Sequence, residues 1–411
     1  MAELISVREA QNSICTQMHR LEEEICGLTE VCGRTLAIDI HSRVDLPPFD
    51  NSSMDGYAVC AADTNQTNEE NPVVLRVTSD IPAGKAPDVE IVAGTAARIM
   101  TGAPIPNGAD AVIPVEWTRT SGSNSIMVLR PVQPGDFIRS RGTDLRSGDL
   151  VFTRGRIVQA QDVGVLAQLG FNSVPVFRRP RIAIISSGDE LLQPGEPLVP
   201  GKIRDANSYT LFHLAKNTNA EVIRLGIAPD DPQKIRVLLD LAVEHHADLI
   251  ISSAGVSVGE YDYVRKIIEE DGTLSFWRVN MRPGKPLAFG NYRGIPIFGL
   301  PGNPVSAFVG FLVFVEPAIH AMTGGCQTNL REIEATTQDE IFSDGRESYL
   351  RAIVKRSPIG YSARLTDEHQ GSGNLLSLSR ANALLIVPSG VKCLPSGTAV
   401  KVWLLDNFKE I

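Results

Sequence analysis

The chain has 411 residues, 43% of them hydrophobic, which is enough apolar material for more than one core and indicates roughly two to four domains. Lys and Arg total 39 against 48 Asp and Glu, so the formal net charge is −9 and a nucleic-acid partner is not expected. Aromatic residues make up only 6% of the chain, few for a platform that stacks bases. An anionic substrate would therefore need local positive charge from Lys or Arg side chains, helix N-termini or a metal.

The six cysteines show no C-x-x-C spacing, and the N-terminus is polar, without the apolar segment of a secretory leader. We therefore expect reduced thiols in a cytoplasmic chain. No apolar run approaches the length needed to cross a membrane, so no membrane partner is expected.

Residues 1–44 together with 147–178 are interpreted as a helix-containing linker domain. Ser6 and Glu9 have the spacing of a capping box, and apolar residues then recur at roughly helical intervals. The simplest interpretation is a first helix that packs on its own domain. A second helix is predicted over 157–169.

Residues 45–146 are predicted to form a small β-rich domain. Short β-branched runs are separated there by Pro, Gly, Asn and Asp clusters. These runs lie at 73–77, 96–100, 111–115 and 126–129. Two motifs, Asn-Ser-Ser-Met-Asp-Gly-Tyr-Ala at 51–58 and Met-Thr-Gly-Ala-Pro at 100–104, are typical of tight turns, and the residues alone do not place them in one site.

Residues 179–325 alternate strands with helices, which predicts an α/β fold with a doubly wound, mostly parallel sheet. The expected strands are 181–185, 221–227, 248–252, 274–279, 287–289 and 295–299. A long apolar helix is expected to end near residue 321. Residues 326–411 return to a turn-rich β pattern, which indicates a C-terminal β-barrel-like domain.

Glycine-rich and serine-rich loops follow the strands of the predicted sheet. Ligands of such sheets bind outside the carboxyl ends of the strands, so these loops are expected at one edge. Gly188, Gly255, Gly259 and Gly302 would allow a ligand to approach the backbone closely, and helix N-termini behind them favour anions. A single loop of this kind is usually only a turn, but several at one edge indicate a site for a phosphate-bearing small molecule. Further candidate contacts in these loops are Asp189, Ser253, Ser257 and Asn303.

Acidic residues crowd the same loops. They are Asp189, Glu190, Asp230, Asp231, Glu260 and Asp262. Helix caps and solvated turns are the ordinary explanation for about half of them. An anion site surrounded by acids needs a bridging divalent cation, and oxygen ligands with few histidines favour Mg²⁺ over Zn²⁺.

Arg282 and Lys285 lie on a turn, Arg-Pro-Gly-Lys-Pro, that two prolines stiffen. An isolated pair of this kind is more often surface charge. Because this turn follows a predicted strand of the sheet domain, it is better interpreted as a cationic site for a phosphate.

Taken together, the ordered motifs resemble the molybdopterin molybdenumtransferase family, whose relatives include the C-terminal domain of gephyrin. The resemblance covers nearly the whole chain. It is carried by residues 51–58, 100–104, 141–144, 187–191, 252–262, 283–286, 299–304 and 369–372.

The resemblance implies an elongated homodimer of four-domain chains. Each site would lie between the sheet domain of one subunit and the β-rich domain of the other. The implied reaction is transfer of molybdenum from molybdate to adenylylated molybdopterin, with Mg²⁺-dependent release of AMP. A contact with the molybdopterin adenylyltransferase that makes this substrate is also implied.

The resemblance also assigns roles to individual residues. The functional acids would be Asp55, Asp144, Glu190, Asp230 and Asp262, of which Glu190, Asp230 and Asp262 would bind the metal. Thr101, Arg351 and Ser372 would contact substrate, Lys285 would hold its phosphate, and Pro301 and Pro304 would shape the pocket wall.

Three positions depart from the family pattern. Ala254 replaces a usual Gly, Arg282 replaces a usual Lys, and Gly373 stands where His is frequent. None of these changes removes an acid. Two alternatives stay open from the sequence: a molybdopterin adenylyltransferase-like enzyme, which shares the sheet domain but lacks the β-rich domains, and a non-catalytic pterin-binding scaffold. The sequence does not distinguish molybdenum from tungsten.

Overall fold

The computed structural model describes residues 4–253, 263–324, 330–358, 360–367 and 369–405. The chain forms two compact units. The first comprises Met1–Ala37, Ile157–Gln159 and Ser173–Ile411, and the second comprises Ile38–Arg156 and Ala160–Asn172. The finer division into four domains stays a prediction.

The first unit contains a six-stranded sheet in the order β16-β13-β17-β21-β20-β18. Its strands are β13 (Arg181–Ser187), β16 (Glu221–Ala228), β17 (Leu249–Ser253), β18 (Gly272–Arg278), β20 (Pro286–Tyr292) and β21 (Ile295–Leu300). β16, β13, β17 and β21 are parallel, whereas β20 runs antiparallel to both β21 and β18. β18 therefore points in the same direction as the parallel strands. The predicted α/β fold with a mostly parallel sheet is confirmed.

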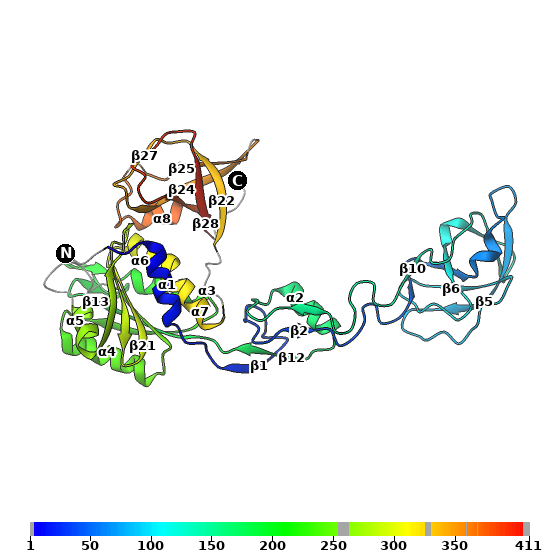
Figure 1. The fold of residues 1–411 in the computed structure, drawn as a ribbon, viewed down its shortest axis with the longest axis horizontal. Coiled ribbons are helices and arrows are strands. Elements are labelled where there is room, and N and C mark those ends of the chain that lie inside the picture. Colours follow the sequence, from blue (N-terminus) through cyan, green and yellow to red (C-terminus); the bar gives the residue numbers. More distant parts are fainter. Residues whose placement is uncertain (1–3, 254–262, 325–329, 359, 368, 406–411) are drawn as a thin grey trace. The chain divides into compact units, whose positions relative to one another are not determined.

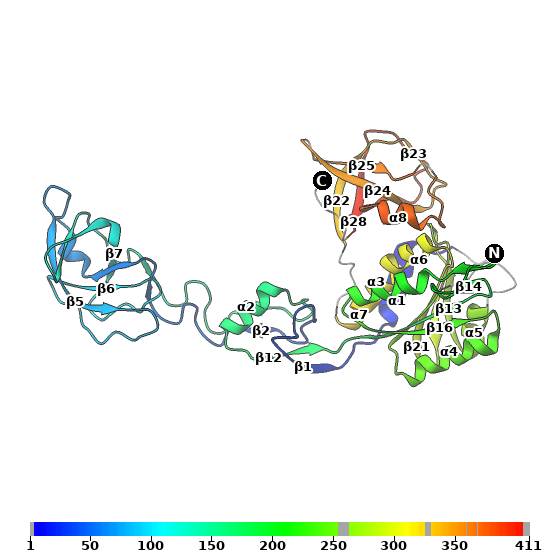
Figure 2. The same cartoon turned by 180° about the vertical axis from the view of Figure 1, so that it is seen from behind.

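Helices cover both faces of this sheet (Figures 1 and 2). The helices are α1 (Val7–Gln17), α3 (Asn207–Asn217), α4 (Pro232–Glu244), α5 (Tyr263–Asp271), α6 (Pro304–Gly310) and α7 (Glu316–Met322). Ile182 and Ile184 of β13 face the core formed with α1, α3, α6 and α7, while Ala183 and Ile185 face the core formed with α4 and α5. Burial on both faces explains why these strands are continuous apolar runs.

Helix α1 begins at the predicted capping box, in which Ser6 and Glu9 each bond to the other's backbone N–H. The helix packs in the same core as α7, and Gln11 Nε2 donates to the carbonyl of Val313 at 2.9 Å. Val313 lies in a π-helical segment, Phe311–Val315, between α6 and α7. Gln11 of α1 thus donates a hydrogen bond to a stretch in which the regular α-helical hydrogen bonding is interrupted.

The helical stretch Pro304–Met322 is 19 residues long and apolar enough to cross a membrane by length and composition. The expectation that no run approaches this length was therefore wrong. In the structure 89% of its apolar window is buried inside the protein. This stretch is a core helix of the sheet domain, which accounts for its hydropathy.

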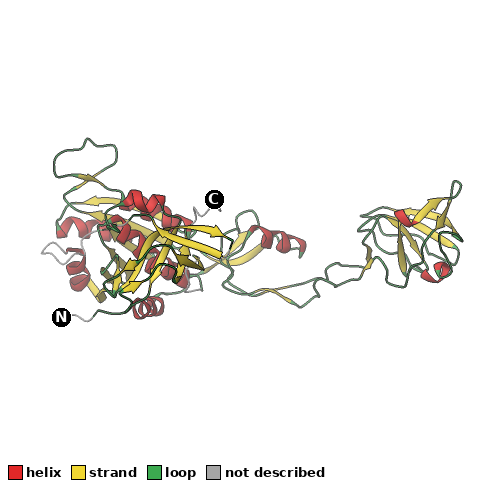
Figure 3. Cartoon of the chain, turned by 90° about the horizontal axis from the view of Figure 1, so that it is seen from above, coloured by secondary structure: helices red, strands yellow, loops and turns green. Residues whose placement is uncertain are grey.

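The second unit is built mainly of strands and loops (Figure 3). Its six-stranded sheet has the order β7-β4-β6-β5-β9-β8. The strands are β4 (Gly56–Val59), β5 (Val73–Ile81), β6 (Thr95–Ile99), β7 (Ala111–Pro114), β8 (Thr118–Thr120) and β9 (Ser125–Val128). Short pairs join β2 (Ile40–His41) to β11 (Leu150–Phe152) and β3 (Asn51–Ser52) to β10 (Ile138–Arg139). Helix α2 (Ala160–Gln168) also belongs to this unit. The predicted β-rich character is confirmed.

A third six-stranded sheet occupies the C-terminal part of the first unit. Its strands are β19 (Met281–Arg282), β22 (Arg331–Thr337), β24 (Glu347–Ser357), β25 (Gly360–Leu365), β26 (Ala383–Val387) and β28 (Ala399–Leu404). β24 pairs with β25 and also with β26, so the pairing β24-β25-β22-β28-β26 closes on itself. Helix α8 (Leu375–Arg380) and the pair β23 (Ile341–Phe342) and β27 (Cys393–Leu394) accompany it.

Two further strand pairs complete the first unit: β1 (Glu23–Gly27) with β12 (Ser173–Phe177), and β14 (Leu191–Leu192) with β15 (Ile203–Arg204). Cys26, Cys32, Cys60 and Cys393 are free thiols, as expected. Cys15 is disulfide-bonded, so the expectation of reduced thiols was wrong for this residue.

Candidate active site

The loop after β13 places the Glu190 carboxylate beside the end of the strand. Gly188 has a φ of +149°, and its N–H donates to the carbonyl of Ala228 at 3.1 Å. A Cβ at this position would lie 2.5 Å from Oε2 of Glu190. Glycine is therefore favoured here by the backbone conformation, and a larger residue would also displace the Glu190 carboxylate from its present position.

Asp189 and Asp230 bind each other's backbones across the ends of β13 and β16. The Asp230 N–H donates to Oδ1 of Asp189 at 3.2 Å, and the Asp189 N–H donates to Oδ2 of Asp230 at 3.4 Å. Two carboxylates are thus held side by side by weak backbone donors. The neighbouring Asp231 has a different role, because it caps α4 by accepting from the N–H groups of Gln233 and Lys234.

Asn207, at the start of α3, ties together two further loops of this edge. Its Nδ2 donates to Oγ of Ser253 and to the carbonyl of Gly302, both at 2.8 Å. Asp205 similarly accepts from the hydroxyl of Ser186 at 3.0 Å. Sequence reasoning missed both residues, because a short polar stretch before a helix is indistinguishable from an ordinary cap.

The loop after β21 leads into α6 with Asn303 as the N-cap residue. The Asn303 side chain makes no capping hydrogen bond to the helix. Pro301 is buried and Pro304 is the first residue of the helix.

Several predicted site residues lie outside the described residues: Gly255, Ser257, Gly259 and Asp262, together with Glu260 and the departure Ala254. Within the described ranges, no three His, Cys, Asp or Glu side chains form a group suited to a metal ion. Of the three predicted metal ligands, the structure therefore describes only Glu190 and Asp230, and the metal assignment stays a prediction.

The Arg282–Lys285 turn connects the sheet to the C-terminal barrel. The Val279 N–H donates to the carbonyl of Lys285 at 3.0 Å, and Arg282 lies in β19, which pairs with β24. Arg282 is half-buried and Lys285 is exposed, and neither side chain forms a hydrogen bond or ion pair with any residue that the structure describes. The pKa of Asp344 is lowered mainly by Arg346 and also by Arg282, so the charge of Arg282 is partly balanced by that carboxylate.

Arg351 is almost completely buried, at 1% exposure, and organises the loop that contains Ser372. Its Nη1 donates to the carbonyls of Gly371 at 2.8 Å and Asn374 at 3.1 Å, and its Nε donates to Gln370. Its Nη2 is buried without a hydrogen-bond partner among the residues that the structure describes. Burial lowers the pKa of the guanidinium, with a smaller opposing effect from Asp367. An oxyanion could accept a hydrogen bond from this buried, unpartnered donor and would also balance the charge of the guanidinium.

Backbone contacts bring the Ser372 loop to the edge of the sheet. The carbonyl of Ser372 accepts from the N–H of Val305 at 3.0 Å, immediately after Pro304. Gly373, the third departure, is exposed, and a side chain there would meet nothing within 4 Å.

A groove of about 900 Å³ borders both the Arg282 turn and the Arg351 loop, a volume suited to a nucleotide-sized molecule. It is lined by Arg282, Gln338, Asp339, Glu340, Ile341, Phe342, Leu350, Arg364, Leu365, Thr366, Asp367 and Gln370.

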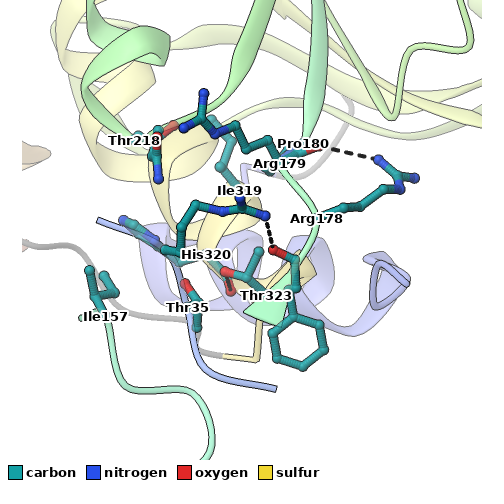
Figure 4. A pocket seen from close by; sticks show the side chains of 12 residues that line it. Thr35, Ile157, Arg178, Arg179, Pro180, Thr218, Ile319, His320 and Thr323 are labelled. Atoms are coloured by element: carbon teal, nitrogen blue, oxygen red, sulfur yellow. Dashed lines mark hydrogen bonds between the residues drawn. The ribbon is translucent and has the colours of Figure 1, made fainter. Parts of the chain in front are cut away.

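Figure 4 shows a second and much smaller cavity, of about 20 Å³, beside the residues that lead into β13. Two of the arginines that line it have partners: Arg34 donates to the carbonyl of Phe177 at 2.8 Å, and Arg178 pairs with Asp248 at 2.7 Å. The space holds about one water molecule and lies at the amino-terminal end of the strand. It is therefore a structural junction rather than a substrate site.

The second unit carries the remaining predicted residues. Oδ1 of Asp55 accepts from both the N–H and the hydroxyl of Thr101, each at 2.7 Å, so two motifs 46 residues apart meet. These two hydrogen bonds lower the pKa of Asp55. Asp144 forms an ion pair with Arg139 instead and makes no hydrogen bond to Asp55 within the described part of this unit.

Comparison with known proteins gives matches along the whole chain. Residues 5–170 match the family described as "MoeA N-terminal region (domain I and II)", residues 183–321 the "Probable molybdopterin binding domain", and residues 334–405 the "MoeA C-terminal region (domain IV)". The chain is 38% identical to the molybdopterin molybdenumtransferase of Nostoc sp., over 97% of this chain and 93% of that protein. It is 34% identical to the molybdopterin molybdenumtransferase of Bacillus subtilis, over 99% of this chain and 96% of the relative.

Solved structures agree. A crystal structure of the molybdopterin biosynthesis MoeA protein of Pyrococcus horikoshii superimposes with a TM-score of 0.85 at 34% identity, covering 98% of this chain and all of that one. Another solved structure of a molybdopterin biosynthesis MoeA protein from Pyrococcus horikoshii has a TM-score of 0.82 at 32% identity, covering 99% of this chain and all of that one.

Proposed function

Because this chain belongs to the molybdopterin molybdenumtransferase family, a family of transferases in molybdenum cofactor biosynthesis, we propose that the loops at the carboxyl edge of its α/β sheet bind adenylylated molybdopterin and release AMP as molybdenum is inserted. The observation that carries the proposal is the grouping of glycine, carboxylate and cationic residues at this edge. Glu190 and Asp230 follow two adjacent strands, and the Ser372 loop is bonded to the start of α6.

Mg²⁺ fits the donors at this edge. Magnesium is usually held by one or two carboxylates together with water and substrate phosphates, so Glu190 and Asp230 would suffice on the protein side. Asp262 is the proposed third ligand. When bound, Mg²⁺ would supply positive charge at the phosphoanhydride that is cleaved. Asp189 has a supporting role, because its carboxylate holds the backbone N–H of Asp230.

The cationic residues of the site are proposed to bind two different oxyanions. Lys285 and Arg282 are proposed to bind a phosphate of the substrate, although Arg282 also interacts electrostatically with Asp344. Arg351 and Ser372 are proposed to contact molybdate, since the buried Nη2 of Arg351 lacks an acceptor. Molybdate is here a substrate and not a resident cofactor.

The site is proposed to be shared between two copies of the chain. Asp55 and Thr101 belong to a different compact unit from Glu190, and Asp144 belongs to that same second unit. A homodimer in which one copy supplies these residues to the other would complete the set. We also propose that the protein works in the cytoplasm and contacts the adenylyltransferase that delivers its substrate.

The test is a reconstituted reaction. Purified protein is mixed with adenylylated molybdopterin, Mg²⁺ and molybdate, and AMP is measured over time. We expect AMP release to require the protein and Mg²⁺ and to stop with EDTA. Replacing molybdate with tungstate measures the metal preference.

Two variants serve as a matched pair. Asp230→Asn should lose the Mg²⁺ dependence and most of the turnover, whereas Asp231→Asn should keep both, because Asn caps a helix about as well as Asp. Tight binding of the pterin without AMP release would favour a scaffold. Formation of adenylylated pterin from ATP would favour an adenylyltransferase.

A further inference from the structure

An aromatic and cationic cluster lies at the same edge of the sheet as the candidate site. It consists of Arg265, Trp277 and Arg278. Because β18 runs in the direction of the parallel strands, its last residues, Trp277 and Arg278, lie at the carboxyl edge. Arg265 joins them from the first turn of α5. Sequence reasoning assigned no role to these three residues.

Both guanidinium groups stack on one indole ring. The Cζ of Arg278 lies 3.7 Å from the ring centroid of Trp277, and the Cζ of Arg265 lies 4.0 Å from it. The pairing of β18 with β20 is irregular between Phe276 and Arg278, which lets neighbouring side chains approach each other. Stacking fixes the orientation of a guanidinium while its N–H edge stays free for an oxyanion.

The charges in the cluster are unequal. Arg265 donates to Glu269 through two nitrogens at 2.9 Å, so its charge is balanced within α5. Arg278 is half-buried and has no hydrogen bond or ion pair with the residues described. It is therefore the member of the cluster with charge to offer a ligand.

Arg278 is also joined to the Arg282–Lys285 turn. It pairs in register with Pro286, and its neighbour Val279 donates to the carbonyl of Lys285. Arg278, Arg282 and Lys285 thus place three cations within eight residues, and no acid stands between them in the sequence. In a chain of net charge −9 this is a local concentration of positive charge.

At the opposite end of the same sheet, an arginine that stacks on an aromatic ring has only a structural role. Arg293, in the turn between β20 and β21, lies 5.3 Å from the ring centroid of Tyr292 and pairs with Asp240 at 2.9 Å. Asp240 also accepts from the Tyr292 hydroxyl at 2.6 Å. That stacked arginine is neutralised, whereas Arg278 at the carboxyl edge has no ion pair with any residue that the structure describes.

We propose that Arg278, oriented by Trp277 and Arg265, is an additional anion-binding residue of this enzyme. It would take a tetrahedral oxyanion, either a phosphate of the organic substrate or molybdate. The proposal deepens the function proposed above and rests on it for the identity of the anion.

The test compares Arg278→Ala, Arg278→Gln and Arg278→Lys with Arg293→Ala as the matched control. Dissociation constants are measured by calorimetry for pyrophosphate, AMP and molybdate separately, and KM and kcat are measured for AMP release. Thermal unfolding checks each fold. If Arg278→Ala is unstable, Arg278→Gln removes the charge while preserving most of the side-chain volume.

We expect loss of the charge to weaken one class of anion by about tenfold to a hundredfold, with a matching rise in KM and little change in kcat. Weakened pyrophosphate binding identifies the phosphate as the ligand, and weakened molybdate binding identifies the oxyanion substrate. Arg278→Lys should recover only part of the affinity, because lysine lacks the planar group that stacks.

Unchanged affinity for all three anions in folded Arg278→Ala and Arg278→Gln would overturn the proposal. An equal loss in Arg293→Ala would also overturn it, since the effect would then be one of general charge. Failure of the wild-type protein to release AMP would count against the proposed function alone, because pyrophosphate and molybdate binding still test Arg278 directly.

Discussion

The two compact units hold their candidate acids in different ways. In the second unit, Asp55 accepts two short hydrogen bonds from Thr101, and these bonds, with a smaller contribution from Arg98, lower its pKa and favour its ionised form. In the first unit, the Glu190 carboxylate has no hydrogen-bond donor among the described residues, and the Asp230 carboxylate accepts only a long bond from the backbone of Asp189. We infer that the acids of the sheet are arranged to bind a cation that arrives with the substrate. The ionised form of Asp55 is instead stabilised by contacts within the protein.

Glu190→Gln tests the sheet side of this comparison and should have the largest effect. An amide oxygen is an uncharged and weaker magnesium ligand, and a metal's stabilisation of developing charge is worth several kcal/mol, so turnover should fall by at least about a hundredfold. AMP release measures the loss, and circular dichroism should show an intact fold. Normal turnover in this variant would remove Glu190 from the catalytic residues.

Hybrid dimers test whether the two kinds of acid meet in one site. Asp55→Asn and Glu190→Gln chains are co-expressed with different tags, and the mixed dimer is purified through both. If each site draws on both chains, one of the two sites carries neither change, and activity should be about half that of the wild-type dimer. Mixed dimers as inactive as their parents would mean that each site is built within one chain.

Lys285→Ala tests the cationic side of the same edge. Removing a charge-assisted contact should raise KM by about tenfold to a hundredfold and leave kcat nearly unchanged, because binding is lost equally in the ground and transition states. Arg282→Ala combined with Lys285→Ala should lose more than the single change, since Arg282 can partly compensate. A normal KM with a collapsed kcat would instead place the lysine at the bond that is cleaved.

Thr101→Ala tests how the pKa of Asp55 is lowered and should have the smallest effect. The variant keeps the backbone donor but loses the hydroxyl, so the pKa of Asp55 should rise part of the way towards its ordinary value. Carboxyl NMR titration measures this change, and Thr101→Ser is the control that retains a hydroxyl.

The sign of the pH dependence follows from the same shift. The folded pKa of Asp55 is below its unfolded value, so the stability it contributes is present above about pH 4 and is lost as the pH falls through the folded pKa. In Thr101→Ala this loss should begin at a higher pH. Identical titrations in the two proteins would show that the hydroxyl has no influence on Asp55.

Local patterns in the sequence determined a large part of this fold. The apolar runs predicted the strands of the sheet, since strands buried on both faces must be apolar throughout, and the Ser6–Glu9 spacing predicted the start of α1. The rule that ligands bind at the carboxyl ends of parallel strands also predicted that the Gly188–Glu190 loop and Asp230 lie at one edge of the sheet.

Only the tertiary structure decided which distant groups meet. Asn207 binds Gly302 across 95 residues, and the carbonyl of Ser372 accepts from Val305, although neither contact leaves a periodic signal in the sequence. The direction of β18, which places Arg278 at the ligand edge, depends on the antiparallel insertion of β20 between it and β21. The physical reason is that side-chain periodicity reports which face of an element is buried, whereas the partner on that face is set by the packing of the whole domain.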